Sequence, residues 1–420
     1  MLTGPSSQFG STQTRMNTLE HEIRVTFRYP VYFSRDVFVS SNPLVLKAAP
    51  SAVAPKPARI LFVLDGGVAE AHPGLQDRVA QYCRDHAGAL ELAAPVLVIP
   101  GGEQSKNDQG PTGRVLQAIH DASLDRHSYV GAIGGGAVLD VVGYAAAMAH
   151  RGIRLIRFPT TVLAQDDSAV GVKNGINAFG QKNYLGTFTP PFAVVNDSSF
   201  LRTLSDRDWR GGLSEAVKAA LIKDHTFFEF IEERAGLLAA RDMTAMEEVI
   251  HRSAALHLHH IATAGDPFEM GSSRPLDFGH WAAHKLERLT NHQLRHGEAV
   301  AIGLALDTTY SYLSGFLAET DWRRVIGLLT RLELAVYAPE LGHRAGDQPA
   351  ILRGLDEFRE HLGGRLTVML LRAIGVPFDA HEIDKGVMLG SVEVLRSLEA
   401  ARHAEGAHGQ PISAKSQRGS

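Results

Sequence analysis

Apolar runs alternate with amphipathic stretches along the first half of the chain. Buried strands are expected at Ile60–Leu64 and in the segments PVLVIP, SYVGAIG and IRLIRFP, and helices are expected over about 74–87, 112–122 and 137–152. Glycine or polar residues follow each of these strands. This alternation predicts an open parallel sheet with its functional site at the carboxyl ends of the strands.

The pattern changes after about residue 198, where apolar positions recur at helical spacing to about Leu317 and again from Asp321 to Leu334. The alternating segment 21–38 is expected to form one or two strands, and the Gly-, Asn- and Lys-rich stretch 166–196 a binding loop that ends in the short strand FAVVN. We therefore expect a disordered N-terminus over 1–20, an α/β domain over 21–197, a helical domain over 198–395 and a disordered tail over 396–420.

Composition describes a globular protein of ordinary polarity. The 420 residues are 44% apolar and 21% charged, with a net charge of −4 and no dense basic run, which argues against nucleic acid or an anionic membrane as the main partner. The single cysteine, Cys83, leaves no internal disulfide and favours a reducing cytoplasm. The N-terminus lacks the features of a signal peptide, and no apolar run approaches membrane-spanning length.

The stretch from Leu276 to Gly303 concentrates four histidines, at positions 280, 284, 292 and 296. His280 and His284 share a helix face, and His296 begins a second apolar helix. Upstream, Glu215 and Lys218 lie three residues apart on a third helix. Two imidazoles from separate helix starts and one carboxylate can bind a divalent metal ion; the alternative is that these are ordinary surface or core histidines.

Three glycines, Gly134–Gly136, stand between a strand and a helix. Such a turn lets backbone N–H groups approach a phosphate at the positive end of the helix dipole, although it also suits a plain tight turn. Asp140 in the following helix and Asp65 at the end of the first strand could hydrogen-bond a nucleotide ribose. The lysines and asparagine at 173, 182 and 183 could hold a phosphate; the alternative is a solvated loop.

Six segments in order resemble the sugar phosphate cyclases, the superfamily of 3-dehydroquinate synthase: PGGEQSK, GGGAVLD, PTT, DDSAVGVK with QKN, SEAVK, and DFGHWAAH with RHGEAV. The resemblance implies a Rossmann-like NAD-binding α/β domain and an all-α metal-binding domain with Zn²⁺ or Co²⁺. It also implies cyclisation of a sugar phosphate by transient oxidation, phosphate elimination, reduction and aldol closure. A homodimer is implied because Arg151 matches an arginine that reaches the neighbouring subunit's phosphate site.

The same resemblance assigns roles position by position. The implied metal ligands are Glu215, His280 and His296. The implied NAD contacts are Asp65, Glu103, Lys106, Gly134, Gly135, Gly136, Asp140, Thr160, Thr161, Asp167, Ser168, Lys173 and Lys182. The implied catalytic residues are Asp167, Lys173, Asn183, Lys218 and His284, and the implied substrate contacts are Arg151, Lys182, His259, Arg274 and Asp277.

Departures from the family pattern bear on the substrate. Where 3-dehydroquinate synthase binds a substrate carboxylate with a lysine and an arginine, this chain has His259 (or His257, if the local alignment slides) and Ser273, with Arg274 adjacent. Asp277 replaces an asparagine and would repel a substrate carboxylate by roughly 1 kcal/mol or more. We therefore expect a neutral sugar phosphate such as sedoheptulose 7-phosphate.

Other features fit no single branch of the superfamily. His284 is kept, whereas valiolone-type cyclases usually replace it, and a late phosphate-binding lysine is missing, with Arg359 or His361 as its possible substitute. The chain therefore resembles a divergent subfamily. Three alternatives stay open from sequence: a true 3-dehydroquinate synthase, an iron-type NAD-dependent polyol dehydrogenase, and a non-catalytic sugar-phosphate binder.

Overall fold

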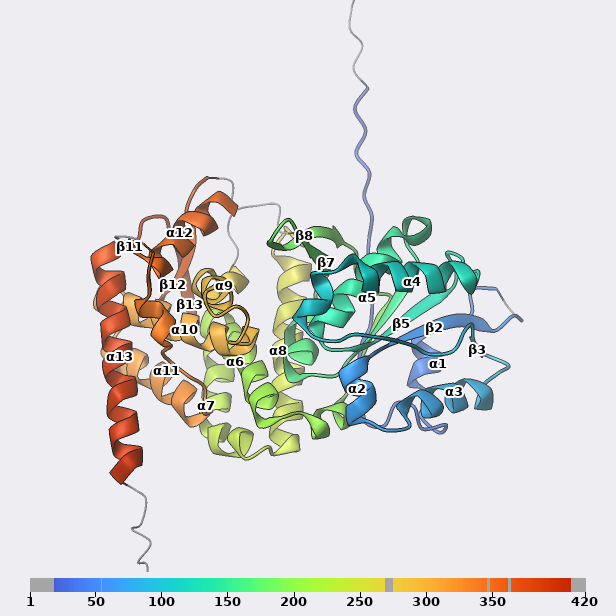
Figure 1. The fold of residues 1–420 in the computed structure, drawn as a ribbon, viewed down its shortest axis with the longest axis horizontal. Coiled ribbons are helices and arrows are strands. Elements are labelled where there is room, and N and C mark those ends of the chain that lie inside the picture. Colours follow the sequence, from blue (N-terminus) through green and yellow to red (C-terminus); the bar gives the residue numbers. More distant parts are fainter. Residues whose placement is uncertain (1–18, 54, 269–274, 346–347, 362–363, 409–420) are drawn as a thin grey trace, which may run out of the picture.

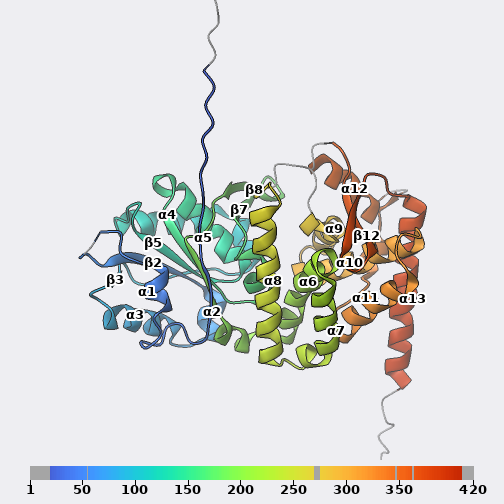
Figure 2. The same cartoon turned by 180° about the vertical axis from the view of Figure 1, so that it is seen from behind.

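The computed structural model describes residues 19–53, 55–268, 275–345, 348–361 and 364–408. Two parts lie side by side, a sheet with its covering helices and a bundle of helices (Figure 1). Seen from behind, helix α8 (Met243–Thr263) stands between them (Figure 2). The predicted division into an α/β part and a helical part is confirmed as a fold class.

A seven-stranded parallel sheet forms the first part. Its strands are β1 (Val31–Ser34), β2 (Ala58–Asp65), β3 (Leu90–Leu92), β4 (Leu97–Ile99), β5 (Tyr129–Gly134), β6 (Arg154–Pro159) and β9 (Ala193–Asp197). Their order is β1-β9-β6-β5-β2-β3, with β4 also pairing β2. The chain builds outward from β2 to β3 and β4 and then returns to β5 on the other side of β2. In sheets of this kind, ligands bind at such a reversal, beyond the carboxyl ends of the strands.

Helices cover both faces of the sheet and bury two separate apolar cores. They are α1 (Leu44–Ala48), α2 (Gly66–Ala71), α3 (Leu75–Asp85), α4 (Gln109–Asp121) and α5 (Gly136–Met148). One core contains Phe62 and Phe158, and the other contains Val63 and Val142. Because both faces are covered, β2 and β5 are buried along nearly their whole lengths, which explains their continuous apolar sequences.

The stretch expected to be a binding loop contains regular structure instead. After the π-helical turn η3 (Ala164–Ser168), strands β7 (Lys173–Ala178) and β8 (Gln181–Phe188) form an antiparallel hairpin. Gly175 and Gly186 face each other in this hairpin, and a Cβ at Gly186 would lie only 2.9 Å from the Asn174 carbonyl oxygen. The glycines that suggested a loop thus permit close approach of two strands.

The helical part is built around α10 (His296–Leu313), which is buried along most of its length. Around it lie α6 (Asp206–Lys223), α7 (His225–Ala239), α9 (His280–Leu289), α11 (Glu319–Arg331), α12 (Ala350–His361), α13 (Lys385–His408) and the hairpin of β12 (Val368–Ala373) and β13 (Val376–Ala380). Within the described residues, no helix is long and apolar enough to cross a membrane.

The expectations for the two chain ends fare differently. Residues 21–38 form one strand, β1, as expected, and the residues before it are mostly exposed. Helix α13 continues to His408, so residues 396–408 are helical and the expected disordered tail is wrong for them. The disorder expected for residues 1–18 and 409–420 lies outside the described residues.

Candidate metal and dinucleotide site

The three predicted metal ligands meet where three helices converge. Glu215 lies on α6, while His280 and His296 are the first residues of α9 and α10. The Nε2 atoms of His280 and His296 lie 3.5 and 3.4 Å from Oε1 of Glu215. One ligand atom from each residue lies within 4.8 Å of the other two. The structure therefore brings together an acidic and two imidazole side chains that are up to 81 positions apart in sequence.

Each of the two imidazoles presents the nitrogen that a metal ion needs. Nδ1 of His280 lies 3.1 Å from the carbonyl oxygen of Phe278, and Nδ1 of His296 lies 3.4 Å from Oε2 of Glu287. An acceptor at Nδ1 holds the proton there and leaves the Nε2 lone pair facing Glu215, as in metal-binding histidines.

The Glu215 carboxylate also fits a cation. It is buried and, among the described residues, both oxygens lack a hydrogen-bond partner, although Lys218 forms an ion pair with it. Lys218 supplies one compensating charge to this buried carboxylate through Oε2, while Oε1 faces both imidazoles, where a cation could bind. One carboxylate and two imidazoles are a donor set that suits Zn²⁺ or Co²⁺.

Glycine contacts hold these helices close enough for the ligands to meet. A Cβ at Gly297 would overlap the carbonyl oxygen of Gly211, so α6 and α10 touch backbone to backbone. A Cβ at Gly303 would likewise overlap the carbonyl oxygen of Gly279, which has a φ of +76°. The glycines beside His280 and His296, noted in the sequence, therefore have a packing role.

Asp307 secures the start of α9 from inside the bundle. This buried carboxylate accepts hydrogen bonds from the Gly279 backbone N–H at 3.1 Å and from Trp281 Nε1 at 2.9 Å. These two donors flank His280. Burial raises the pKa of Asp307 to about 7, against the lowering effect of both hydrogen bonds.

Charged groups pack densely beside the metal ligands. Burial acts to lower the pKa of Lys218, but the carboxylates of Glu215 and Asp167 outweigh it and raise that pKa, so the ammonium stays charged. Oδ1 of Asp167 lies 2.7 Å from Nδ1 of His257. The adjacent Asp166 is fully buried, and desolvation, with the nearby carboxylates of Asp167 and Glu215, raises its pKa well above the usual value.

His284 lies on the same face of α9 as His280. Its ring is 5.6 Å from that of His280 and 6.0 Å from that of His296, centre to centre. Partial enclosure in this cleft, together with the Lys182 ammonium, lowers the pKa of His284, although its edge is open to solvent. The lowered pKa favours the neutral imidazole at pH 7 and makes it a weaker proton acceptor than an ordinary histidine.

A second polar cluster joins predicted cofactor and substrate residues. Nζ of Lys106 lies 2.7 Å from Oδ2 of Asp140 and also donates to Oδ1 of Asn183. Nζ of Lys182 lies 3.0 Å from Oε1 of Glu287 and 3.9 Å from Oε1 of Glu103. Because Glu287 also faces His296, this cluster connects directly to the metal ligands.

The carboxyl ends of β5 and β6 fit a dinucleotide. Gly134–Gly136 form the turn into α5, whose N-terminus has no side-chain cap. A Cβ at Gly136 would lie 2.9 Å from the Ser168 hydroxyl. Among the described residues, the buried hydroxyls of Thr160 and Ser168 lack hydrogen-bond partners. An uncapped helix N-terminus beside unpaired hydroxyls suits a pyrophosphate.

The remaining predicted cofactor residues lie around this turn. Thr160 and Thr161 follow β6, and the Thr161 hydroxyl accepts from the Ala164 backbone N–H at 3.1 Å. Asp65, at the end of β2, accepts from the Gly67 N–H at 2.8 Å and so caps α2. Lys173 begins β7, and its carbonyl oxygen accepts from Arg157.

Arg157 was not identified from sequence, yet it organises the active-site loop. Its buried guanidinium donates to the carbonyl oxygens of Ala169, Gly171 and Lys173 and to Oδ1 of Asn174. The available signal was an arginine in the middle of the mostly apolar strand IRLIRFP, which also carries Arg154 near its start. Arg157 thereby fixes the backbone that follows Asp167.

The predicted substrate residues Arg151, His259 and Asp277 lie in three different elements. Arg151 lies in the exposed turn beyond α5, roughly 20 Å along that helix from the glycine turn at 1.5 Å per residue. On α8, His257 and not the exposed His259 faces Asp167, so the structure favours His257 for that position. Asp277 lies in the short helix η5 (Pro275–Asp277), near enough to Lys218 to contribute to its raised pKa. Arg274 and Ser273 lie outside the described residues.

The proposed substitutes for the late lysine lie on α12. Arg359 forms an ion pair with Asp356 at 3.5 Å. His361 is the last residue of that helix. Neither observation assigns them a phosphate-binding role.

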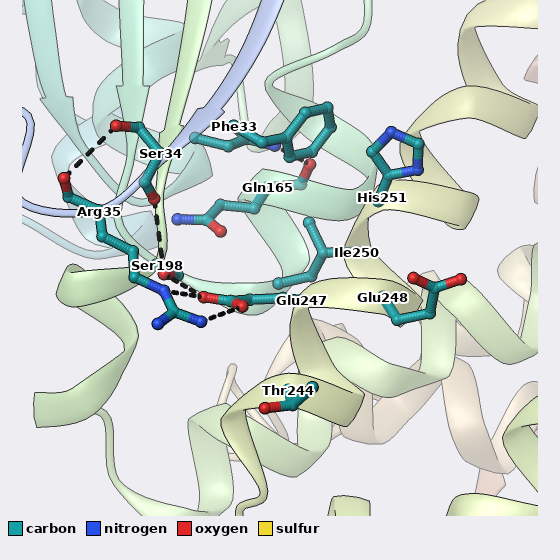
Figure 3. A pocket seen from close by; sticks show the side chains of 11 residues that line it. Phe33, Ser34, Arg35, Gln165, Ser198, Thr244, Glu247, Glu248, Ile250 and His251 are labelled. Atoms are coloured by element: carbon teal, nitrogen blue, oxygen red, sulfur yellow. Dashed lines mark hydrogen bonds and ion pairs between the residues drawn. The ribbon is translucent and has the colours of Figure 1, made fainter.

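A separate cavity of about 480 Å³ lies between β1, β9 and α8 (Figure 3). Its polar wall joins Arg35, Glu247 and Ser198 by hydrogen bonds, and the rings of Phe33 and His251 lie 4.8 Å apart. Gln165 of η3 also lines it, but none of the predicted catalytic residues does. This cavity is therefore distinct from the metal site.

Fold and site together define a protein with a dinucleotide-type parallel sheet and a helical part in which a glutamate and two histidines lie close enough together to hold one metal ion. Residues 96–211 match the 3-dehydroquinate synthase N-terminal domain, and residues 212–347 match its C-terminal domain. The chain therefore belongs to the 3-dehydroquinate synthase family of sugar phosphate cyclases.

Individual relatives agree with this assignment. The chain is 33% identical to the 3-dehydroquinate synthase of Ruegeria pomeroyi over 86% of its own length and 96% of that protein. It is 40% identical to the 3-dehydroquinate synthase of Geobacter sp. over 58% of its length and 67% of that protein. Among solved structures, it resembles 2-epi-5-epi-valiolone synthase from Streptomyces hygroscopicus with NAD⁺ and Zn²⁺ bound, with a TM-score of 0.80, 27% identity, and coverage of 90% and 100% of the two chains.

Proposed function

We propose that this sugar phosphate cyclase uses NAD and a divalent metal ion to cyclise a neutral sugar phosphate, with sedoheptulose 7-phosphate as the leading candidate. The observation that carries the proposal is the buried group of Glu215, His280 and His296, with the Lys218 ammonium against the carboxylate. We further propose that it acts as a homodimer in the cytoplasm. Family membership argues against the polyol dehydrogenase alternative, and the complete ligand set argues against a non-catalytic binder.

The side chains around the metal group suit distinct steps. Bound NAD would supply reversible oxidation of a substrate hydroxyl, and a bound divalent cation would supply the charge that acidifies it. Lys218 stays protonated and would stabilise negative charge on a substrate oxygen. The neutral His284 would accept a proton and return it. Lys182, on β8 beside Glu287, would help hold the phosphate.

The charges near Lys218 support a substrate without a carboxylate. The carboxylates of Glu215, Asp167 and Asp277 all raise the pKa of the Lys218 ammonium. The fully buried Asp166 beside them has a raised pKa, which favours its neutral form, so it is not counted among these negative charges. Because acidic groups outnumber Lys218 here, an additional substrate carboxylate would meet repulsion.

The position of Arg151 supports the homodimer. At the far end of α5, its side chain is too distant to serve the site of its own chain, but it is exposed and free to reach a neighbouring subunit. His150 and Arg151 both have positive φ, at 51° and 63°. Two consecutive strained residues directly before Gly152 fit a segment with a role beyond closing a turn.

The test is turnover by purified, metal-loaded enzyme with NAD, measured as phosphate release. The second candidate, a true 3-dehydroquinate synthase, is favoured by the names of the relatives and would require an acidic heptulosonate phosphate. We expect a higher kcat/KM for sedoheptulose 7-phosphate. Faster release from the heptulosonate would overturn the neutral-substrate proposal and favour the second candidate.

A variant makes this test sharper. Asp277→Asn removes one carboxylate beside Lys218 and should shift the ratio of the two kcat/KM values toward the acidic substrate. Asp356→Asn, on α12 and half-exposed, is a matched control that should leave the ratio unchanged. An unchanged ratio in Asp277→Asn would show that Asp277 does not determine the preference between the two substrates.

A further inference from the structure

Residues 19–30 leave the body of the molecule as an extended chain that continues backward from β1 (Figures 1 and 2). Their odd-numbered positions are mostly apolar or aromatic, and Leu19, Ile23, Val25 and Phe27 are 85%, 86%, 67% and 55% exposed. A strand with unpaired backbone groups and one apolar face is a ready surface for strand addition. Among the described residues, none forms a backbone hydrogen bond with residues 19–29, so this edge is open to strand addition.

The base of this segment is anchored close to the active-site loop. The Tyr29 hydroxyl donates to the carbonyl oxygen of Val170 at 2.8 Å, three residues after Asp167. The ring of Phe27 lies 6.3 Å from that of Phe268, which stacks on Phe188 at the end of β8. These contacts direct the segment outward and extend its apolar face toward the hairpin that carries Lys182.

We propose that residues 21–29 pair antiparallel with the same residues of a second copy of this chain, across a two-fold axis at Val25. The proposal adds a contact surface to the homodimer proposed above and rests on it. The segment is self-complementary, as a two-fold contact between identical chains requires. Its acidic residues precede its basic residues, so an antiparallel pair places opposite charges together, whereas a parallel pair would place like charges together.

Charge and pattern also select the register. An axis at Val25 sets Glu22 opposite Arg28, Arg24 opposite Thr26 and Ile23 opposite Phe27. An axis at Arg24 would set that arginine against itself, and an axis at Thr26 would set Arg24 against Arg28. An axis at Ile23 would set Glu22 opposite Arg24, but these two already pair at 2.6 Å within one chain, and Arg28 would then lie opposite position 18, outside the described residues. Any axis that passes through a residue pairs odd positions with odd positions, so both apolar faces lie on one side of the ribbon.

The pairing would bring the partner's chain beside the aromatic group at the base of the segment. In this register the partner's His21 lies opposite Tyr29, and the partner's Ile23 lies opposite Phe27. Because Tyr29 holds the Val170 carbonyl, the contact would brace the loop that carries Asp167. A second copy meets the charge requirement, because the acidic half of the segment faces the basic half of its partner.

Disulfide trapping in the full-length protein tests the axis. Val25→Cys places two thiols directly opposite each other, within reach of a disulfide, and should give a covalent dimer under mild oxidation. Leu19→Cys is the matched control on the same exposed face. Its two copies would lie about 40 Å apart, at about 3.4 Å per residue, and should stay reduced. The native Cys83 is buried and does not compete.

Charge exchange provides an independent readout. Arg28→Glu sets like charges opposite each other and should lower the yield of the Val25→Cys cross-link. Adding Glu22→Arg restores opposite charges and should restore the yield. If light scattering finds a dimer while Val25→Cys stays reduced, or if Leu19→Cys cross-links equally well, this contact is wrong and the proposed homodimer stands. A monomer by light scattering would overturn both.

Discussion

At Glu287, one carboxylate serves both polar clusters of the site. Its oxygens face Nδ1 of His296 at 3.4 Å and Nζ of Lys182 at 3.0 Å, and the side chain is almost fully buried. The residue lies seven positions after His280 and three after His284, on the same face of α9, but its role was not identified from sequence. A glutamate in an amphipathic helix is usually a solvated residue, so only its position beside His296 reveals it.

Glu287→Gln should weaken metal binding because the side chain keeps its size and loses its charge. Removing such a supporting group typically lowers metal affinity by about 10- to 100-fold. The measurement is competition with a chelator of known affinity. Glu357→Gln, on α12, removes a carboxylate that pairs with Lys285 and touches no metal ligand, so it serves as the control. An affinity unchanged in Glu287→Gln would contradict this role.

Asp307 should make stability depend on pH in a specific direction. Its pKa of about 7 in the folded chain lies above the usual carboxyl value, so the folded state holds an extra proton between these values. The contribution of this protonation to the free energy of unfolding is therefore fully present below about pH 4. It is lost as the pH rises through 7, and the free energy of unfolding then falls by up to about 1.4 kcal/mol per pH unit.

Urea denaturation of wild type and Asp307→Asn at several pH values from 5 to 8 measures this effect. The difference between the two stabilities should fall as the pH rises, because the asparagine does not titrate. Parallel curves would mean that Asp307 has an ordinary pKa and that burial does not raise it.

At the scale of elements, backbone contact between α6 and α10 controls the site. Gly211 and Gly297 allow the two helices to touch. Glu215 lies one helical turn after Gly211, and His296 directly precedes Gly297. The sequence predicted these helices and both ligands, because period and residue type are local properties. It did not predict which glycines form the contact.

Gly297→Ala should separate α10 from α6 and weaken the metal site together with the fold. Insertion of a methyl group into a packed backbone contact typically costs about 1–3 kcal/mol, and His296 moves with its helix. Denaturant unfolding and metal titration on the same preparation measure both effects.

Gly327→Ala on α11 is the matched control. A Cβ there has no described neighbour within 4 Å, so the change should stabilise the helix by about 0.5–1 kcal/mol and leave metal affinity unchanged. Gly297→Ala with wild-type metal affinity would show that the helix contact does not position the ligands.

At the scale of the whole molecule, the metal site joins three helices of the bundle core. Glu215, His280 and His296 come from α6, α9 and α10, which pack closely on one another. Because these ligands are separated in the unfolded chain, metal binding should add directly to the stability of the folded state.

Removal of the metal with a chelator should lower the unfolding temperature, and added Zn²⁺ should restore it. Free metal at about 1,000 times its dissociation constant corresponds to about 4 kcal/mol of stabilisation. His296→Ala should unfold at the same temperature with and without chelator. A chelator effect of equal size in His296→Ala would place the stabilising ion elsewhere.

The sequence by itself determined the alternation of strands and helices from β2 to β6 and the glycine turn after β5 and, through its resemblance to a family, the three side chains that converge. Each depends on a short-range pattern: apolar periodicity, glycine before a helix, or a motif of a few residues. Only the tertiary structure decided that Arg157 clamps the loop after Asp167, that His257 and not His259 faces this loop, and that Glu287 supports His296. All three contacts join different elements, and each depends on which side of a strand or helix meets its neighbour, which the packing of the whole chain sets.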